Sequence, residues 1–447
     1  MSRRLSRRSN LKATVIGAGL AGCEAAWALA REGVAVTLME MKPEKRTPAH
    51  RYGGFAELVC SNSLKAARAG SAAGLLKAEM RRMGSLLLEC ADKTAVPAGG
   101  ALAVDRERFS DLATEAVCAH PLIAVERGEQ TELPAGPVIV ATGPLTTDAL
   151  ARSIERLCGA ATLRFYDAAA PIVTLDSLDR ERVFFAARYG RGEDDYVNCP
   201  FTREEYEAFH EALVQAEGAD LHDIDRGSLA VYEGCMPVEV MAKRGADTLR
   251  YGPLKPVGLT DPRTGRRPWA VAQLRQENSE GTLYNLVGFQ TNLKFGEQKR
   301  VFSMIPGLAQ AEFVRYGVMH RNTFLDSPRL LDADFSLRRE PRIFFAGQIT
   351  GVEGYMESAA SGLLAAKNLA ARLRGGPPLR LPPDTMLGAL ANYISDAGIK
   401  NFQPMGANMG ILPALEDKIK DKRLRYEALA RRALESLEKT LESGGDY

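Results

Sequence analysis

The pattern of apolar and polar positions near the start of the chain predicts a strand, a glycine-rich turn, a helix and a second strand. Residues 13–16 are an apolar, β-branched run, residues 17–22 read GAGLAG, and residues 23–30 are rich in alanine and leucine. The next β-branched run, residues 34–39, ends at the acidic Glu40. This order of elements is typical of a parallel, Rossmann-like sheet in which a nucleotide lies against the glycine turn.

Two later segments repeat the step from an apolar strand into a turn. The first, residues 138–141, leads into Thr142, and the second, residues 343–346, leads into Gly347. An alanine-rich stretch of helical character, residues 358–373, follows the second turn. Because backbone amides at such turns can hold an anion, we expect both segments to belong to the same nucleotide-binding sheet. That sheet is then split in the sequence by an insertion.

The region between these segments has a different pattern. Short alternating runs at residues 270–274 and 283–289, with a turn cluster at 261–265, predict antiparallel strands connected by loops. Residues 203–215 predict a helix within the same region. A tail over residues 414–442 also looks helical, and its mixed charges are typical of a solvated face.

The sequence therefore predicts an α/β fold, with a Rossmann-like FAD-binding domain split in sequence and an inserted mixed α+β domain. The predicted domains are residues 1–164 for the first part of the FAD-binding domain, 165–338 for the inserted substrate or RNA domain, and 339–447 for the second part with a helical C-terminal tail. A glycine turn alone does not distinguish NAD from FAD. The split arrangement, with one turn reading ATG and a later one reading AGQ, favours FAD bound deep in a large domain.

The predicted cofactor contacts come from the three turns and from the acid after the second strand. Glycines at the first turn let the backbone approach a pyrophosphate, and a carboxylate at Glu40 can take the ribose hydroxyls. The alternative is a tight strand-to-helix turn without a ligand. The candidate residues are Gly17, Ala18, Gly19, Leu20, Ala21, Gly22, Glu40, Thr142, Gly143, Gly347, Gln348 and Gly351.

Composition places the chain among ordinary globular proteins. Of 447 residues, 45% are hydrophobic and 26% are charged, and 58 basic residues against 56 acidic ones leave a net charge of +2. This balance excludes a histone-like polycation. The basic residues are nevertheless uneven: an arginine-rich arm occupies the first dozen residues, and segment 250–300 carries more basic than acidic residues. An acidic partner would meet a local patch.

The cysteines and histidines exclude several kinds of site. Seven cysteines spread through the chain do not form a secreted disulfide framework, and neither a CxxC nor an HExxH spacing occurs, so we expect no metal. The apolar stretch behind the basic N-terminus is interrupted by glycines, so it is a poor match to the apolar region of a signal peptide, and no apolar run is long enough to span a membrane. We therefore expect a cytoplasmic protein without a membrane segment.

Two cysteines are candidates for catalysis. Cys60 begins the segment CSNS ahead of a helix-prone stretch, where a helix N-terminus would lower its thiol pKa. Cys235 lies between Gly234 and Met236 in EGCMP, with a Lys-Arg pair nearby that would favour a thiolate. For each, a packed structural cysteine is the alternative, and the residues alone leave this choice open. The packed reading is the one expected for Cys23, Cys90, Cys118 and Cys158.

A third candidate site joins two segments that are distant in sequence. His320 lies in GVMHRNT, and Tyr355 lies in GYMES. Together they could stack on and hydrogen-bond a heteroaromatic ligand, although a lone histidine or tyrosine is more often a core or rim residue.

Taken together, these motifs closely resemble the folate- and FAD-dependent tRNA (uracil-5-)-methyltransferase family. The resemblance runs nearly end to end and leaves out only the basic N-terminal arm and the extreme C-terminus. The CSNS and EGCMP segments are far more specific than a dinucleotide fingerprint. The matching segments include VIGAGLAGCEAAW, RYGVMHRNTF, FFAGQITGVEGYMESAASG and KNFQPMGANMG, the last with small departures at Gly406 and Met409.

The resemblance implies a specific reaction. A thiolate adds to C6 of a uracil, and C5 then accepts a one-carbon unit from methylenetetrahydrofolate. Reduced FAD delivers the hydride, and NADH or NADPH recharges the flavin. Cys60 and Cys235 match the two functional cysteines of the family; we place Cys235 nearer the RNA base, although the sequence does not settle which does what. His320 and Tyr355 become candidates for the pterin face of the folate.

The RNA implied by the resemblance is tRNA, with the target uridine in the T-loop. An enzyme must extrude such a base, because a stacked base hides C5 and C6. The basic excess of segment 250–300 suits the flanking phosphates, with a solvated surface as the alternative.

Three alternatives stay open at this point. A related FAD-dependent family modifies wobble uridines, but its members are longer and lack CSNS and EGCMP in this form. The same chemistry on a ribosomal RNA uridine is the second. A non-catalytic flavoprotein that binds RNA is the third, and the presence of both Cys60 and Cys235 in loop-like settings argues against it.

Overall fold

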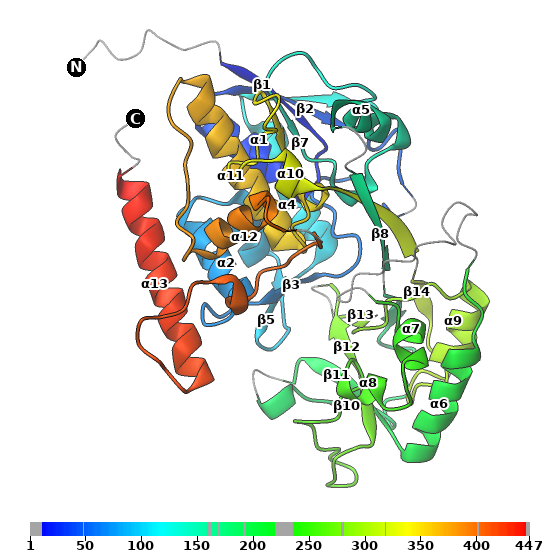
Figure 1. Cartoon of the computed structure of the whole chain (residues 1–447). Helices are drawn as coiled ribbons and strands as arrows, with labels where there is room; N and C mark the ends of the chain where they lie inside the picture. The colour runs from blue at the N-terminus through cyan, green and yellow to red at the C-terminus, as the bar shows by residue number, and fades with distance from the viewer. Residues whose placement is uncertain are drawn as a thin grey trace.

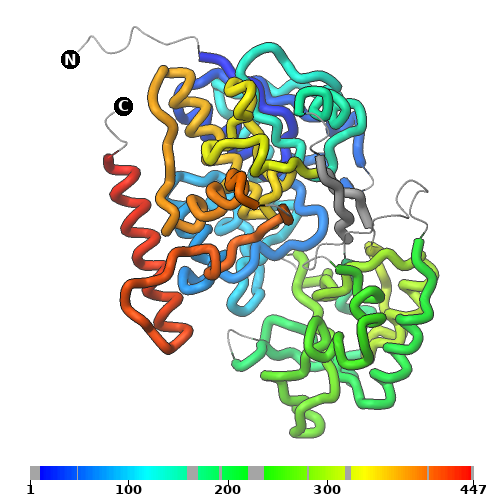
Figure 2. The backbone as a smooth tube through the Cα atoms, viewed as in Figure 1, coloured from blue at the N-terminus to red at the C-terminus, as the bar shows by residue number. Residues whose placement is uncertain are grey.

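The chain folds into two lobes, as the computed structural model in Figure 1 shows. The structure describes residues 11–47, 49–158, 162–168, 170–190, 194–219, 236–278, 281–317, 319–399 and 402–443, with backbone alone at 162–168 and 319–323. The larger lobe holds both ends of the described chain, and the tube in Figure 2 passes into the smaller lobe and back. The strands β8 (Thr162–Ala168) and β15 (Met319–Leu325) pair with each other where the chain enters and leaves the smaller lobe.

A parallel five-stranded sheet organises the larger lobe. Its strand order is β16-β7-β1-β2-β6, and every neighbouring pair is parallel. The strands are β1 (Lys12–Ile16), β2 (Ala35–Glu40), β6 (Ile123–Arg127), β7 (Val138–Val140) and β16 (Ile343–Phe345). Because β7 and β16 are distant in sequence from β1, this order confirms the prediction of a parallel, Rossmann-like sheet that is split by an insertion.

Two helices pack closely against each other beside this sheet, namely α1 (Leu20–Arg31) and α11 (Tyr355–Leu373). A Cβ on Gly362 would lie 2.1 Å from the backbone oxygen of Ala21, so glycine is required for this close approach. The contact joins the first glycine turn to the late one. The packing of α1 against α11 therefore brings the first glycine turn and the late turn close together.

Further helices and a small sheet complete the larger lobe. The helices are α2 (Ala72–Arg82), α3 (Leu86–Lys93), α4 (Arg106–Ala119), α5 (Asp148–Cys158), α10 (Ser327–Leu330), α12 (Met386–Ser395) and α13 (Lys422–Ser443). The small sheet contains β3 (Ser63–Ala66), β4 (Ala95–Val96) and β5 (Ala101–Val104) in the order β3-β5-β4.

Two buried carboxylates cap helices from a distance in sequence. Glu24 accepts hydrogen bonds from the backbone N–H groups of Leu86 and Leu87 at the start of α3. Glu79 accepts from the N–H groups of Met386 and Leu387 at the start of α12. Each pair of bonds satisfies donors that a helix leaves without an intrahelical partner.

Burial raises the pKa of Glu79 to about 7, and this shift makes stability depend on pH. Because the folded state holds the proton more tightly, the contribution of Glu79 is fully present below the pKa of the unfolded carboxyl and is lost as the pH rises through about 7. Glu79→Gln does not titrate. We expect calorimetry to give a larger difference in Tm between wild type and this variant at about pH 5 than at about pH 8. The exposed Glu89→Gln serves as the control, and equal differences at both pH values would contradict the assignment.

The smaller lobe is built on a six-stranded sheet of order β10-β11-β12-β13-β9-β14. Its strands are β9 (Ile172–Thr174), β10 (Phe184–Phe185), β11 (Tyr196–Phe201), β12 (Ala270–Gln276), β13 (Leu283–Leu286) and β14 (Phe313–Arg315). The helices α6 (Arg203–Gln215), α7 (Val238–Lys243), α8 (Thr248–Tyr251) and α9 (Phe295–Phe302) accompany it. All the pairings are antiparallel, as predicted for the insertion, and α6 occupies the predicted residues.

Each lobe has its own hydrophobic core. The core of the smaller lobe extends from Val173 to Ala311, and the core of the larger lobe resumes at Phe324 and includes Phe335 and Leu337. The predicted division at residues 165 and 338 stays a prediction, and these cores favour a second limit nearer Met319. Among the described residues, no helix is both long enough and apolar enough to cross a membrane.

The expectations about the cysteines are confirmed in part. The residues after Cys60 form the strand β3, and the helix whose start lies beside Cys60 is α11, which begins at Tyr355. Cys118 is exposed on α4, which corrects the expectation of a packed cysteine, because the buried face of this helix is formed by Phe109, Ala113 and Val117. Cys23, Cys90 and Cys158 are buried, as expected.

Candidate active site

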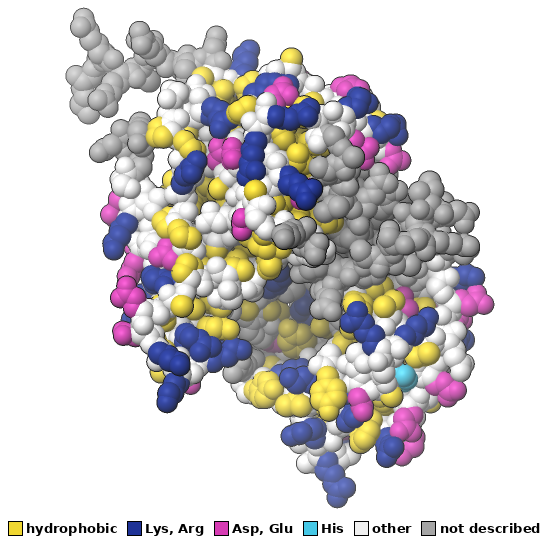
Figure 3. All heavy atoms as spheres, viewed as in Figure 1, with side chains coloured by type: hydrophobic (Ala, Val, Ile, Leu, Met, Phe, Trp, Pro, Cys, Tyr) yellow, Lys and Arg dark blue, Asp and Glu magenta, His cyan; other side chains and the backbone are white. Residues whose placement is uncertain are grey.

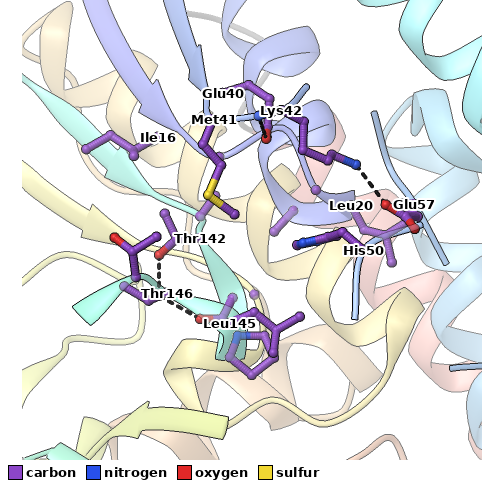
Figure 4. A pocket seen from close by; sticks show the side chains of 18 of the residues that line it. Ile16, Leu20, Glu40, Met41, Lys42, His50, Glu57, Thr142, Leu145 and Thr146 are labelled. Atoms are coloured by element: carbon purple, nitrogen blue, oxygen red, sulfur yellow. Dashed lines mark hydrogen bonds and ion pairs between the residues drawn. The ribbon is translucent and has the colours of Figure 1, made fainter. Parts of the chain in front are cut away.

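A cavity of about 160 Å³ lies at the carboxyl ends of the parallel strands, where doubly wound folds bind their ligands. Figure 4 shows it from close by, with Ile16, Glu40 and Thr142 coming from the ends of three strands. The predicted residues that line it are Gly17, Gly19, Leu20, Ala21, Glu40, Thr142, Gly143, Gly347, Gln348 and Tyr355. Ala18, Gly22 and Gly351 are not among the lining residues.

The glycines of the first turn have different physical roles. A Cβ on Gly22 would lie 1.7 Å from the backbone oxygen of Gly17, so this glycine makes the turn itself possible. Gly17 has a φ of +94°, which favours glycine. Gly19, in contrast, would place a Cβ in open space, with no protein atom within 4 Å. Because Gly19 lines the cavity, its missing side chain leaves room for a ligand.

Glu40 ties the end of β2 to the glycine turn. Its two carboxylate oxygens accept the backbone N–H of Ala18 at 2.6 Å and that of Lys42 at 2.8 Å. The side chain is 6% exposed, and it still lines the cavity. A carboxylate held in this way has lone pairs left to accept hydroxyl donors from a sugar.

Several lining residues were not predicted from the sequence, and Lys42, His50 and Glu57 are titratable members of this group. Figure 4 shows Lys42 directed toward Glu57, and their charged atoms lie 3.0 Å apart. Burial alone would raise the pKa of Glu57, but Lys42 and two backbone N–H groups outweigh it and lower that pKa. Burial lowers the pKa of His50, so its imidazole favours the neutral form. No motif in the sequence marks these residues.

Cys60 lies beside the cavity, against Tyr355 at the start of α11. The Tyr355 hydroxyl donates to Cys60 Sγ at 3.0 Å and accepts the backbone N–H groups of Cys60 at 2.7 Å and of Ser61 at 3.1 Å. Burial, and then the neighbouring Cys60, raise the pKa of Tyr355 well above its usual value, so the hydroxyl keeps its proton. A hydroxyl that donates to sulfur favours the thiolate form of a cysteine.

The residues that follow Cys60 are anchored to the smaller lobe. The side chain of Asn62 is fully buried and donates to the backbone oxygens of Gln276 and Glu277. Arg275 on β12 donates to Asn62 Oδ1 at 3.0 Å and to Ser61 Oγ at 2.7 Å. The CSNS segment therefore holds the two lobes together at the edge of the cavity.

Two arginines hold the residues that precede Cys60. Arg106 donates to the backbone oxygen of Leu58 at 2.8 Å and forms an ion pair with the buried Glu277. Arg315 on β14 donates to the backbone oxygen of Val59. Burial, and then the nearby Arg106, lower the pKa of Arg315 to about 10, so the Arg315 guanidinium is still charged near neutral pH.

The remaining predicted residues are described only in part. Cys235 lies outside the described residues, as do Gly234 and the residues before it from 220 onward. His320 lies on β15, where its backbone pairs with Asp167, and its side chain is outside the description. The strand β15 contacts η1 (Gly143–Leu145) and η5 (Gln348–Thr350), two turns that border the cavity.

Comparisons with known proteins identify close relatives. Residues 12–377 match the family model described as glucose inhibited division protein A. The chain is 61% identical over 427 residues to methylenetetrahydrofolate–tRNA-(uracil-5-)-methyltransferase TrmFO of Heliobacterium modesticaldum, covering 95% of this chain and 97% of that protein. It is 55% identical over 432 residues to the protein of the same name from Enterococcus faecalis, covering 97% and 99%.

A solved structure supports the fold assignment. GidA of Aquifex aeolicus in its form II crystal superposes with a TM-score of 0.71, covering 96% of this chain and 74% of that one. The two sequences are 16% identical, so this comparison concerns the fold alone. It agrees with a parallel sheet split by an inserted lobe.

Proposed function

Because the chain belongs to the family of methylenetetrahydrofolate–tRNA-(uracil-5-)-methyltransferases, we propose that it methylates C5 of a uridine in tRNA. The one-carbon unit comes from methylenetetrahydrofolate, and the target uridine lies in the T-loop. The observation that carries the proposal is Cys60, held by Tyr355 at the edge of a nucleotide-type cavity. A substrate of this kind places the enzyme in the cytoplasm.

The residues of the first cavity fit FAD. Gly19 and Gly143 both line it, and a Cβ on either would meet no protein atom within 4 Å, which leaves the backbone open to a ligand. The carboxylate of Glu40 is fixed where a ribose would bind. Bound FAD, once reduced, supplies the hydride that converts the transferred carbon into a methyl group. We assign FAD binding to the twelve candidate residues, which are Glu40 and the residues of the three turns. Among them, Ala18, Gly22 and Gly351 do not line the cavity and shape the turns instead.

We assign the two catalytic cysteines to different parts of the reaction. Cys60 lies next to Val59 and Tyr355, which line the FAD cavity, and this supports a role on the flavin side. Cys235 is then the thiolate that adds to C6 of the uracil, which raises the nucleophilicity of C5. The Tyr355 hydroxyl holds the Cys60 sulfur in place and keeps a proton available at that atom.

The folate and the nicotinamide cofactor complete the proposal. The pterin of methylenetetrahydrofolate lies near the strand β15, between His320 and the FAD cavity, with Tyr355 at the opposite wall. The contacts of β15 with η1 and η5 support this placement. NADH or NADPH reduces the flavin between turnovers, and no metal takes part in the reaction.

The proposal is tested with purified protein, FAD, NAD(P)H, methylenetetrahydrofolate and an unmodified tRNA transcript. Nucleoside mass spectrometry with the modified position mapped should detect 5-methyluridine in the T-loop only when the folate is present. If ribosomal RNA were methylated while tRNA stayed unmodified, the substrate of the same reaction would be ribosomal RNA. Unmodified RNA of both kinds, with FAD bound, would favour a non-catalytic flavoprotein.

Replacing Arg275 tests whether the anchoring of the CSNS segment matters for the reaction. In Arg275→Met, Asn62 Oδ1 and Ser61 Oγ lose their hydrogen bonds to the guanidinium, so the loop that carries Cys60 loses a charged tether. We expect kcat to fall by about tenfold while the FAD content stays unchanged, because a small misplacement of a reacting group is costly. The exposed Arg203→Met on α6 is the control. Unchanged kcat in Arg275→Met would show that the tether is dispensable.

A further inference from the structure

A second cavity, of about 540 Å³, lies between the two lobes. Its volume is within the range of small-molecule sites. Tyr52 and Arg106 line it from the larger lobe, and Phe295, Val314 and Tyr316 line it from the smaller lobe. The proposed function so far assigns nothing to this cavity.

The second cavity adjoins the FAD cavity through the segment that leads to Cys60. Glu57 lines both cavities, while Leu58 lines the second and Val59 lines the first. Cys60 follows directly in the chain. A ligand in the second cavity is therefore separated from the FAD cavity by the few residues that carry the catalytic thiol.

A stack of aromatic rings forms one wall of this cavity. The rings of Phe295 and Tyr316 are stacked with centroids 5.2 Å apart and planes inclined by 21°. Phe313 continues the stack behind Tyr316, at 5.5 Å and 9°. Phe295 is 55% exposed, so a supported ring face is left open at the cavity. Exposed aromatic faces backed by a second ring are the platforms on which proteins stack nucleobases.

The charges around the cavity distinguish between classes of ligand. The charged residues that line it are Arg51, Arg106, Arg315, Glu57, Asp105, Glu107 and Glu277. Arg106 is paired with Glu277, and Arg315 with a backbone oxygen. Because Glu57 is in turn paired with Lys42, the four carboxylates of the lining are balanced by its three arginines and Lys42, and no excess of positive charge is available for a dianionic group such as the glutamate tail of a folate. A neutral aromatic ring needs no such excess.

We propose that this inter-lobe cavity receives the extruded uracil of the RNA and that Phe295, backed by Tyr316, is the platform on which the base stacks. The inference rests on the proposed function and adds the residues that select and position the target base. It also explains why the CSNS segment is tied to both lobes: the walls of the base pocket belong to different lobes and must keep a fixed separation.

Kinetics of Phe295 variants test the platform. Phe295→Ala should raise KM for the tRNA transcript by about tenfold, the effect expected for one lost base–aromatic stack. Phe295→Tyr should stay within about twofold of wild type, because it keeps the ring face. KM for methylenetetrahydrofolate and the FAD content should not change. The control is Tyr251→Ala, since this residue is 85% exposed and lines neither cavity.

Photocrosslinking places the base independently of turnover. A transcript with 4-thiouridine at the target position is irradiated with the wild-type enzyme, and the modified peptide is mapped by mass spectrometry. The expected adduct lies on the peptide that carries Phe295 or Tyr316. Adducts only on peptides outside the cavity wall would overturn the inference, as would a KM effect on the folate alone.

The two proposals fail in different ways. If Phe295→Ala methylates the T-loop with an unchanged KM for tRNA, the platform is refuted and the methyltransferase function stands. If wild type crosslinks at Phe295 or Tyr316 but yields no 5-methyluridine, the function is refuted and the base pocket stands. Absence of both product and crosslink refutes both.

Discussion

Replacing Cys60 with alanine is expected to abolish formation of 5-methyluridine while FAD remains bound. Cys60 does not line the FAD cavity itself, and its sulfur is held by the Tyr355 hydroxyl at 3.0 Å. Loss of the thiol therefore removes a reacting group without opening the cofactor site. We expect kcat to fall by about 10³-fold or more, the scale seen when an essential catalytic side chain is removed.

Cys60→Ser and an exposed cysteine make this prediction specific. Serine keeps a side chain that can accept from Tyr355, but its hydroxyl is far less acidic than a thiol, so activity should remain lost. Cys118→Ala is the matched control, because Cys118 is exposed near the C-terminal end of α4 and lines neither cavity. Turnover is measured by nucleoside mass spectrometry and FAD content by visible absorbance. If the Cys60→Ala enzyme were active, Cys60 would have a structural role only and no catalytic one.

The sheet and its glycine turn could be predicted because their causes are local in sequence. The contact that requires glycine at Gly22 is made with Gly17, five positions away, and the apolar runs on either side specify the strand and the helix. The later strands β7 and β16 were recognised by the same step from an apolar run into a turn. Each of these signals lies within a short window of the chain.

The contacts that complete the site are distant in sequence and left no local signal. Cys60 meets Tyr355 across 295 positions, and Asn62 meets Arg275 across 213. Each residue was visible in the sequence, but no spacing rule connects them. Tyr355 is predicted at the folate, and the structure also places its hydroxyl against the thiol of Cys60.

The excess of basic residues in segment 250–300 predicts a patch for RNA phosphates, but ion pairs in the structure weaken this prediction. Arg275 is 7% exposed and serves the CSNS segment. Other basic residues of the segment form ion pairs, namely Arg250 with Asp247, Arg263 with Asp261, Lys294 with Glu217 and Arg300 with Glu297. Figure 3 shows basic and acidic side chains interspersed on both lobes. Net charge counts residues, whereas an RNA meets only those that remain accessible, so the patch is weaker than the count indicates.

Replacing Gly19 with alanine is expected to remove FAD while leaving the fold intact. Gly19 adopts an extended backbone with a φ of −74°, which alanine tolerates, and the added Cβ would meet no protein atom within 4 Å. Because the same position lines the cavity at the turn where a pyrophosphate approaches the backbone, the methyl group would occupy space that the cofactor needs.

We expect the Kd of Gly19→Ala for FAD to rise by about 100-fold, equivalent to about 2.8 kcal/mol, with loss of the yellow colour on purification. The Tm of the cofactor-free protein should match that of cofactor-free wild type, measured by calorimetry. Gly100→Ala is the matched control, since its Cβ also meets open space but lies outside both cavities. Gly22→Ala, whose Cβ would clash with Gly17, should instead lower the Tm of the cofactor-free protein. Tight FAD binding by a stable Gly19→Ala protein would show that the cofactor does not approach this turn, and the assignment of the first cavity to FAD would then fail.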